Sequence, residues 1–166
     1  MKKKPRRRTK AEQRRYNMSR IKSKDTAIEI MFRRALWRAG IRYRKNDKRL
    51  PGKPDIVLEK HKIAIFCDGE FWHGKDWRFQ KDSIRTNRDY WIPKIERNMR
   101  RDNEIEKQLA KRGWLVLRFW GRDIQKELAL CVKEVQDALF QRELDAYDVF
   151  DGYYDAEQAP DGGFRL

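Results

Sequence analysis

Cysteine and histidine are scarce in this sequence, which excludes one class of protein. The 166 residues contain the cysteines Cys67 and Cys131, the histidines His61 and His73, and no others of either kind. Two cysteines do not build a disulfide scaffold, and these two form no C-x-x-C pair. A small secreted disulfide-rich domain is therefore excluded, and a reducing, cytoplasmic location is expected.

Long apolar runs are also missing. The longest, residues 63–67, is far shorter than the roughly 20 residues with which a helix crosses a bilayer. The basic amino terminus is not followed by an apolar stretch, so it lacks the pattern of a secretory signal. No long basic segment has one clean apolar face, which argues against binding to a membrane surface. We therefore expect no membrane partner.

Acidic residues are outnumbered by basic ones. The sequence has 41 Lys and Arg against 26 Asp and Glu, a formal net charge of +15. A chain with this excess favours polyanions, because neutralising phosphates releases condensed counterions. Six Trp, eight Phe and six Tyr supply large apolar side chains for a core. The composition thus predicts one folded domain that binds nucleic acid.

The two ends of the chain differ from its middle. Residues 1–16 form a basic arm and residues 145–166 an acidic tail, both expected to be weakly ordered, so the folded domain is predicted at 17–144. The cations of the arm are predicted to contact DNA phosphates, although a purely solubilising role stays open. They are Lys2, Lys3, Lys4, Arg6, Arg7 and Arg8.

The spacing of apolar residues predicts helices that alternate with strands. Helical periodicity runs over residues 26–39 and 90–112, and again from Ile124 to Leu139. Short apolar runs predict four strands, of which the last three are expected to be buried. The strands are residues 41–44, 55–58, 63–67 and 114–119. This alternation predicts an α/β fold, a three-layer sandwich with a central mixed β-sheet flanked by helices.

Several carboxylates stand at the ends of the predicted strands. Asp55 opens one buried strand and Asp68 ends the next, with Glu70 and His73 close behind. Mg²⁺ binds one or two carboxylates together with water and substrate oxygens, so this pattern suits hydrolysis of a phosphodiester. Glu29, in the first predicted helix, is a further acid that could reach the same end of the sheet.

Each of these residues also has a purely structural interpretation. Asp55 could be a turn residue after Pro54, and Asp68 could belong to an ordinary Asp-Gly turn. Glu29 could only close the capping box that Thr26 begins. His73 could only pack among neighbouring aromatic rings. The spacing alone leaves these alternatives open.

Six short motifs occur in a consistent order over residues 17–120. They are Asn17-Met18-Ser19-Arg20-Ile21, Asp25-Thr26-x-x-Glu29, Leu50-Pro51-Gly52-Lys53-Pro54-Asp55, Gly69-x-Phe71-Trp72-His73-Gly74, Trp91-x-x-Lys94-Ile95-x-x-Asn98-x-x-x-Asp102 and Gly113-Trp114-x-Val116-Leu117. In these motifs the chain resembles the very-short-patch mismatch-repair endonucleases of the PD-(D/E)XK nuclease superfamily. The resemblance implies a restriction-endonuclease-like fold and a metal-dependent DNA endonuclease.

The resemblance also implies roles for individual residues. Asp55 would be the principal ligand of Mg²⁺ or Mn²⁺, with the backbone carbonyl of Cys67 as a further ligand. His73 would be the general base or the group that positions water, since a histidine can accept a proton near neutrality. Glu29 and Asp102 would be acidic supports around this site.

The chain departs from the family at the metal sites. Asp68 stands where the mismatch enzymes have a second histidine, and we interpret it as a second metal ligand. At the positions of the family's structural zinc the sequence has Glu70, Lys75, Trp77 and Arg122, a poor set of zinc ligands, so no zinc is expected. Glu70 is then a metal ligand or the base.

Without zinc, the segment that follows the third predicted strand needs other support. We expect packing of Trp72, Trp77 and Phe79 to hold residues 69–86 in place.

An aromatic wedge is the last feature that the resemblance implies. Phe71, Trp72 and Trp91, with Met18 from the opposite side, would unstack double-stranded DNA at a mismatch. The resemblance thus favours a monomeric enzyme that nicks DNA as in T·G mismatch repair. A restriction-type or structure-specific nicking endonuclease stays open, as does a non-catalytic DNA-binding module. Acids clustered without a metal would repel phosphate, which argues against the last.

Overall fold

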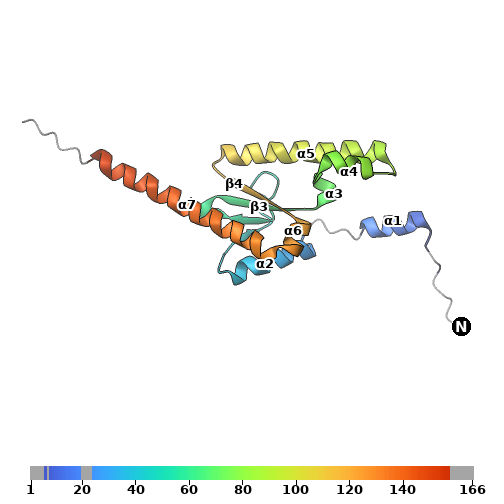
Figure 1. Ribbon diagram of the computed structural model, residues 1–166, viewed down its shortest axis with the longest axis horizontal. Helices are drawn as coiled ribbons and strands as arrows, with labels where there is room; N and C mark the ends of the chain where they lie inside the picture. The colour runs from blue at the N-terminus through green and yellow to red at the C-terminus, as the bar shows by residue number, and fades with distance from the viewer. Residues whose placement is uncertain (1–5, 7, 20–23, 158–166) are drawn as a thin grey trace, which may run out of the picture.

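A mixed four-stranded sheet lies at the centre of the protein (Figure 1). The computed structural model describes residues 6, 8–19 and 24–157; the side chains at 14–15, 17–19 and 148–157 are outside that description. The strands follow the order β1 (Arg44–Lys45), β2 (Ile56–Leu58), β3 (Ile63–Asp68) and β4 (Leu115–Trp120). The first three are antiparallel neighbours, and β4 pairs parallel with β3.

Helices cover both faces of this sheet. Figure 1 shows α5 (Arg88–Lys111) on one side, and α2 (Ala27–Arg38), α6 (Gly121–Lys126) and α7 (Leu128–Glu157) on the other. Along β3, Ile63 and Ile65 join the core beneath α2 and α7, while Ala64 and Phe66 face the core of α5. Successive side chains of a strand point to opposite faces, so one apolar strand serves two cores. The predicted three-layer α/β sandwich is confirmed.

The first domain helix begins as the sequence predicts. Thr26 caps α2 by accepting the backbone N–H of Glu29 at 3.3 Å, and the Glu29 carboxylate returns to the Thr26 hydroxyl at 2.9 Å. Such a reciprocal cap satisfies groups that the helix cannot pair internally. The parallel connection between β3 and β4 runs through α5, whose buried Ile95 and Leu109 were among the residues that predict that helix.

Three predictions about the elements need correction. The segment after β3, where the sequence predicts no helix before residue 90, includes α3 (Glu70–His73) and α4 (Trp77–Ser83). The last predicted helix is two helices, α6 and α7, since Glu127 leaves helical geometry with φ −126° and ψ 37°. Strand β4 is mostly half-buried rather than buried, because it lies at the edge of the sheet.

The ends of the expected domain are helical. The helix α1 (Lys10–Ser19) includes part of the predicted basic arm, and α7 continues to Glu157, beyond the expected boundary at residue 144. A short 3₁₀ turn, η1 (Glu59–His61), joins β2 to β3. Within the described residues, no helix combines the length and hydropathy that crossing a membrane requires.

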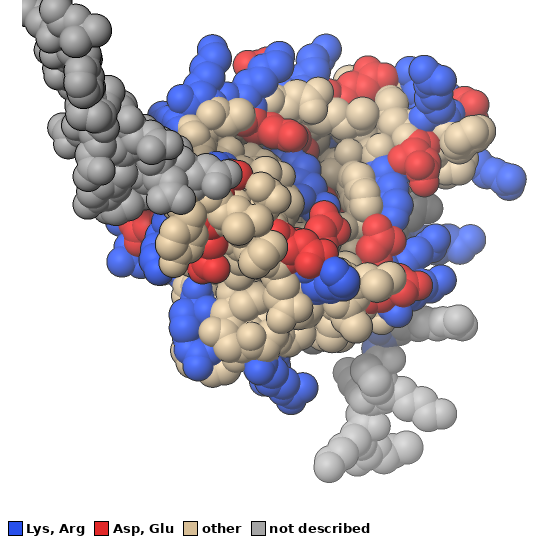
Figure 2. Space-filling view, turned by 60° about the vertical axis from the view of Figure 1, so that its left-hand side comes forward, with Lys and Arg blue, Asp and Glu red and all other residues tan. Residues whose placement is uncertain are grey.

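Charges of both signs cover the surface. On the face in Figure 2, Lys and Arg side chains project around much of the margin, and acidic side chains gather nearer the middle.

Candidate active site

Asp55 is fixed by the pairing of β2 with β3. Its backbone N–H donates to the Ile65 carbonyl at 3.0 Å, and its Oδ2 accepts the backbone N–H of Cys67 at 2.8 Å. The side chain is thereby held against β3 just before β2 begins. Burial, together with the charges of Glu29 and Asp68, raises the pKa of Asp55 to about 6 even though the Cys67 N–H acts in the other direction. A site that crowds ionised carboxylates in this way favours a cation.

The predicted residues line one pocket. A pocket of about 480 Å³ has Glu29, Asp55, Cys67, Asp68 and His73 in its wall. Two neighbouring pockets, of about 330 and 420 Å³, also contain Asp68 and His73. A larger pocket of about 610 Å³ lies between η1 and α7, but none of the predicted catalytic residues lines it. The lining residues therefore favour the pocket of about 480 Å³ as the active site over the pocket of about 610 Å³.

The donor set fits a hard cation bound partly by water. Among the described residues, no group of three or more His, Cys, Asp and Glu side chains is placed to hold a metal ion by itself. Mg²⁺ needs no such group, because one or two carboxylates with carbonyl, water and phosphate oxygens suffice. Asp55 engages Cys67 through Oδ2 only, so Oδ1 can serve a cation beside the Cys67 backbone.

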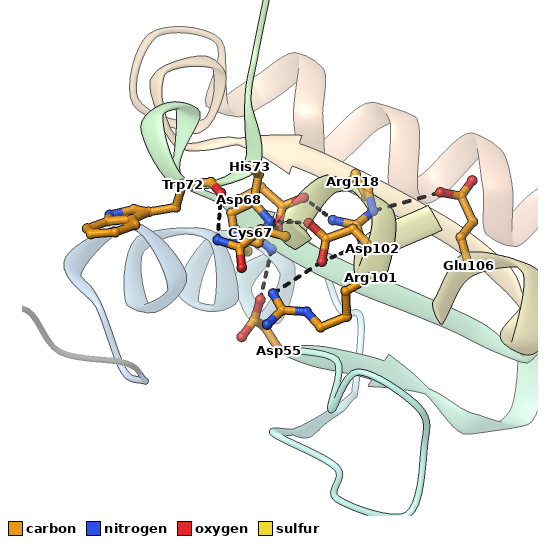
Figure 3. A network of polar contacts seen from close by, with 10 residues as sticks. Asp55, Cys67, Asp68, Trp72, His73, Arg101, Asp102, Glu106 and Arg118 are labelled. Atoms are coloured by element: carbon orange, nitrogen blue, oxygen red, sulfur yellow. Dashed lines mark hydrogen bonds and ion pairs between the residues drawn. The ribbon is translucent and has the colours of Figure 1, made fainter. Parts of the chain in front are cut away.

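His73 is oriented by two carboxylates (Figure 3). Its Nδ1 lies 2.6 Å from Oδ2 of Asp102, on α5, and 3.5 Å from Oδ1 of Asp68, on β3. In a neutral ring whose Nδ1–H donates to Asp102, Nε2 carries the lone pair that accepts a proton. Burial acts to raise the pKa of Asp102, but the hydrogen bond and charge of His73, with Arg118 and Arg101, bring it below its ordinary value. Asp102 therefore stays ionised beside His73.

Asp68 faces His73 with one oxygen and Arg118 with the other. Its Oδ2 accepts a short hydrogen bond from Arg118 on β4. Arg118 was not among the predicted site residues, although one charged residue within the apolar strand Leu115–Trp120 is a signal that it has an acidic partner. Asp68 lies in the site as expected; whether it also binds a metal stays a prediction.

Glu29 also lines the pocket that contains Asp55. Its two oxygens accept hydrogen bonds from Asp25 and Thr26, both at 2.9 Å, and only 5% of the residue is exposed. Arg33 lies 3.8 Å from the same carboxylate. Glu29 thus closes the capping box and also places negative charge beside Asp55, while its role in catalysis stays a prediction.

Glu70 lies apart from the other predicted residues. Its Oε1 accepts the backbone N–H of Arg122 at 2.5 Å, at the start of α6. Lys75 makes a second link to α6 through both oxygens of Asp123, each at 2.9 Å. These polar contacts join the α3–α4 segment to the end of β4, where the family would have zinc.

The remaining support of the α3–α4 segment differs from the prediction. Phe79 is 82% exposed, so its predicted packing role is wrong. Trp77 instead donates to Glu96 at 3.4 Å, and Lys81 pairs with the same carboxylate at 3.0 Å. Glu96 of α5 comes close to α4 only in the folded protein, so the sequence does not reveal this polar support.

The aromatic residues of the predicted wedge form one cluster beside the pocket. The ring centroids of Phe71, Trp72 and Trp91 lie 5.2 to 5.5 Å apart, all with edge-to-face geometry. Trp72 also lines the pocket that contains Asp55, and its carbonyl accepts a hydrogen bond from Asn98 at 3.0 Å. Phe71 is 37% exposed. Met18 lies in α1, but its side chain is outside the described part of the chain.

The basic arm is described only in part. Of its predicted phosphate contacts, Lys2, Lys3, Lys4 and Arg7 lie outside the described residues. Arg6 pairs with Glu12 at 3.2 Å, and the Arg8 guanidinium lies 3.7 Å from the ring centroid of Tyr16. Arg6 and Arg8 therefore contact α1 in this structure.

Comparison with known proteins gives a consistent result. Residues 8–79 match the family model described as DNA mismatch endonuclease Vsr. The type II nicking enzyme V.NmeDIP of Neisseria meningitidis serogroup C is 49% identical over 128 residues, which are 77% of this chain and 86% of that protein. V.HpaIIP of Haemophilus parainfluenzae, also a type II nicking enzyme, is 47% identical over 73% of this chain and 86% of its own.

A mismatch endonuclease is among the relatives as well. The DNA mismatch endonuclease Vsr of Escherichia coli (strain K12) is 37% identical over 105 residues, 63% of this chain and 66% of that protein. The matches to nicking enzymes span most of both chains, and the range matched by the family model includes Asp55 and His73. The chain belongs to the Vsr family of DNA mismatch endonucleases.

Proposed function

We propose that the protein is a divalent-metal-dependent endonuclease that nicks one strand of duplex DNA at a local pairing defect. One observation carries the proposal: the pocket lined by Asp55, Asp68 and His73 directly adjoins the cluster of Phe71, Trp72 and Trp91. The residues proposed to hydrolyse DNA and those proposed to unstack bases therefore lie next to each other, where β3 ends.

Asp55 and the backbone carbonyl of Cys67 would hold the cation, with Asp68 as the predicted second carboxylate. Bound Mg²⁺ or Mn²⁺ supplies charge neutralisation at the phosphate and lowers the pKa of water. Nε2 of His73 takes the proton of the attacking water, while Asp102 holds Nδ1–H and so stabilises the imidazolium that forms. Glu29 contributes negative charge beside Asp55 and keeps the start of α2 in place.

The aromatic cluster would supply the preference for defective duplexes. Inserting a ring between base pairs requires unstacking, which costs a few kcal/mol and less where pairing is already faulty. The relatives that are named type II nicking enzymes favour a second candidate, a nicking enzyme that does not need a mismatch.

One experiment separates these functions. Two duplexes of identical flanking sequence, one matched and one with a T·G pair, are incubated with the protein and Mg²⁺, and cuts on each strand are mapped. We expect a single nick near the T·G pair that EDTA abolishes. Equal nicking of both duplexes favours the second candidate, and binding without any cut favours a non-catalytic module.

A further inference from the structure

Arg118 is a charged residue in an apolar strand. It belongs to β4, its partner in the register of β3 is Phe66, and its side chain is only 20% exposed. The guanidinium carbon lies 4.7 Å from the centre of the Phe66 ring. A cation this deeply placed must be compensated by nearby acids.

Three carboxylates surround the guanidinium (Figure 3). Nη1 donates to Oδ2 of Asp68, Nη2 lies 3.8 Å from Oδ1 of Asp102, and Nε lies 3.9 Å from Oε2 of Glu106. Glu106 is about half exposed, so the first two contacts matter most.

Asp68 and Asp102 turn their other oxygens to His73. Oδ1 of Asp68 lies 3.5 Å and Oδ2 of Asp102 lies 2.6 Å from the same Nδ1. Each carboxylate therefore bridges the imidazole and the guanidinium, and the four side chains close a ring. We refer to His73, Asp68, Arg118 and Asp102 as the His73 network.

The His73 network needs the positive charge of Arg118 to keep its two carboxylates close together. Two carboxylates that face one imidazole nitrogen repel each other, and a neutral His73 offers a single N–H to share between them. The guanidinium presents several donors in a rigid plane and can hold both carboxylates at fixed positions. Asp102 also accepts a hydrogen bond from Arg101 at 3.4 Å, but Arg118 is the arginine that contacts both carboxylates. Without Arg118, the spacing of Asp68 and Asp102 is no longer fixed, and the imidazole loses its two-sided support.

We propose that Arg118 is a positioning residue that fixes the orientation of the His73 imidazole through Asp68 and Asp102. Arg118 lies against the Phe66 ring, and this role does not require a contact between Arg118 and DNA. The inference rests on the proposed function only in assigning His73 a part in DNA nicking.

The test uses two substitutions and one control. Arg118→Met keeps an apolar stem over Phe66 and removes the charge, whereas Arg118→Lys keeps the charge without the planar fork. Arg38→Met removes an exposed arginine near the end of α2 and corrects for the loss of one positive charge. For each purified protein, kcat and KM for nicking of one duplex and the imidazole ¹⁵N chemical shifts are measured.

Two histidines make the spectroscopic measurement simple, since a His61→Gln variant assigns both sets of signals. We expect Arg118→Met to shift the His73 signals and to lower kcat on the order of 10- to 100-fold, with KM changed less than about twofold. Arg118→Lys should fall between Arg118→Met and the wild type, and Arg38→Met should leave both the His73 signals and kcat unchanged.

Other outcomes overturn the inference. A rise in KM at constant kcat, together with unmoved His73 signals, would make Arg118 a DNA contact instead. Unchanged kinetics and unchanged signals would make it a structural residue only. If the wild type does not nick DNA but Arg118→Met still shifts the His73 signals, the proposed function fails and the positioning role stands.

Discussion

Ionised Asp55 destabilises the folded protein when no metal is bound. Its carboxylate is partly buried, lies near Glu29 and Asp68, and has a pKa raised to about 6 from an ordinary 3.8. In the folded protein Asp55 therefore binds a proton more tightly than in the unfolded chain. The resulting destabilisation is absent at low pH, grows between about pH 4 and pH 6, and is complete above pH 6.

Asp55→Asn should therefore stabilise the metal-free protein. At pH 7.5 in EDTA we expect its free energy of unfolding to exceed that of the wild type by an amount bounded at about 3 kcal/mol, and the difference should vanish near pH 4. Denaturant unfolding followed by circular dichroism at a series of pH values checks this. A wild type that is more stable than the variant at pH 7.5 in EDTA would contradict the assigned environment of Asp55.

Individual site residues could be predicted to different extents. Asp55 and Asp68 stand at strand ends, a pattern that local sequence shows, and the motifs added His73 and Asp102. Arg118 stands out as the charged residue of an apolar strand, but local sequence does not identify its partner Asp68, which lies 50 residues away. The pairing becomes visible only when β4 is placed beside β3.

Among the elements, long periodic segments were predictable and short ones were not. The helices α2 and α5 and the strands β2 and β3 were expected within a few residues of their bounds. The helices α3 and α4 are too short to show helical periodicity in the sequence. Contacts with α5 and α6 hold them in place. The edge position of β4 depends on the order of strands, which apolar runs do not reveal.

The links between the α3–α4 segment and α6 should be modest in energy. Lys75 and Asp123 are 25% and 44% exposed, so solvent screens their attraction, and we expect Lys75→Met to lower the free energy of unfolding by about 0.5–1 kcal/mol. Lys133→Met breaks the more exposed pair with Asp137 and serves as the control, with a smaller expected loss.

Elemental analysis of the purified protein should find no zinc. One zinc per chain would show that another ligand set holds the α3–α4 segment.

The aromatic cluster should determine the preference for a mismatched duplex. Trp72→Ala should reduce the preference for a T·G duplex over a matched one about tenfold, since a lost difference of 1.4 kcal/mol in opening cost corresponds to that factor. Trp37→Ala, which removes a Trp that is 53% exposed on α2, is the matched control. Competition between labelled duplexes measures the preference. A preference that survives loss of Trp72 would leave the cluster without a role in opening the duplex.

For the whole molecule, charge governs affinity more than specificity. The net charge of +15 predicts strong, salt-dependent binding to any duplex. Deleting residues 1–8 removes six cations and should weaken binding to matched and mismatched duplexes alike. The slope of log affinity against log salt should fall by roughly one for each lost phosphate contact, as measured by fluorescence anisotropy. An unchanged slope would leave the arm as a solubilising segment.

The account of the whole molecule depends on Asp55 as the residue that binds the catalytic metal. Its most direct test is the single-turnover nicking rate of wild type and Asp55→Asn in Mg²⁺, with DNA affinity measured on the same preparations. We predict that the variant binds DNA at least as tightly, because one negative charge is gone, and nicks at least about a hundredfold more slowly, because a metal ligand supplies several kcal/mol of stabilisation. A folded Asp55→Asn protein that nicks at the wild-type rate would contradict the account.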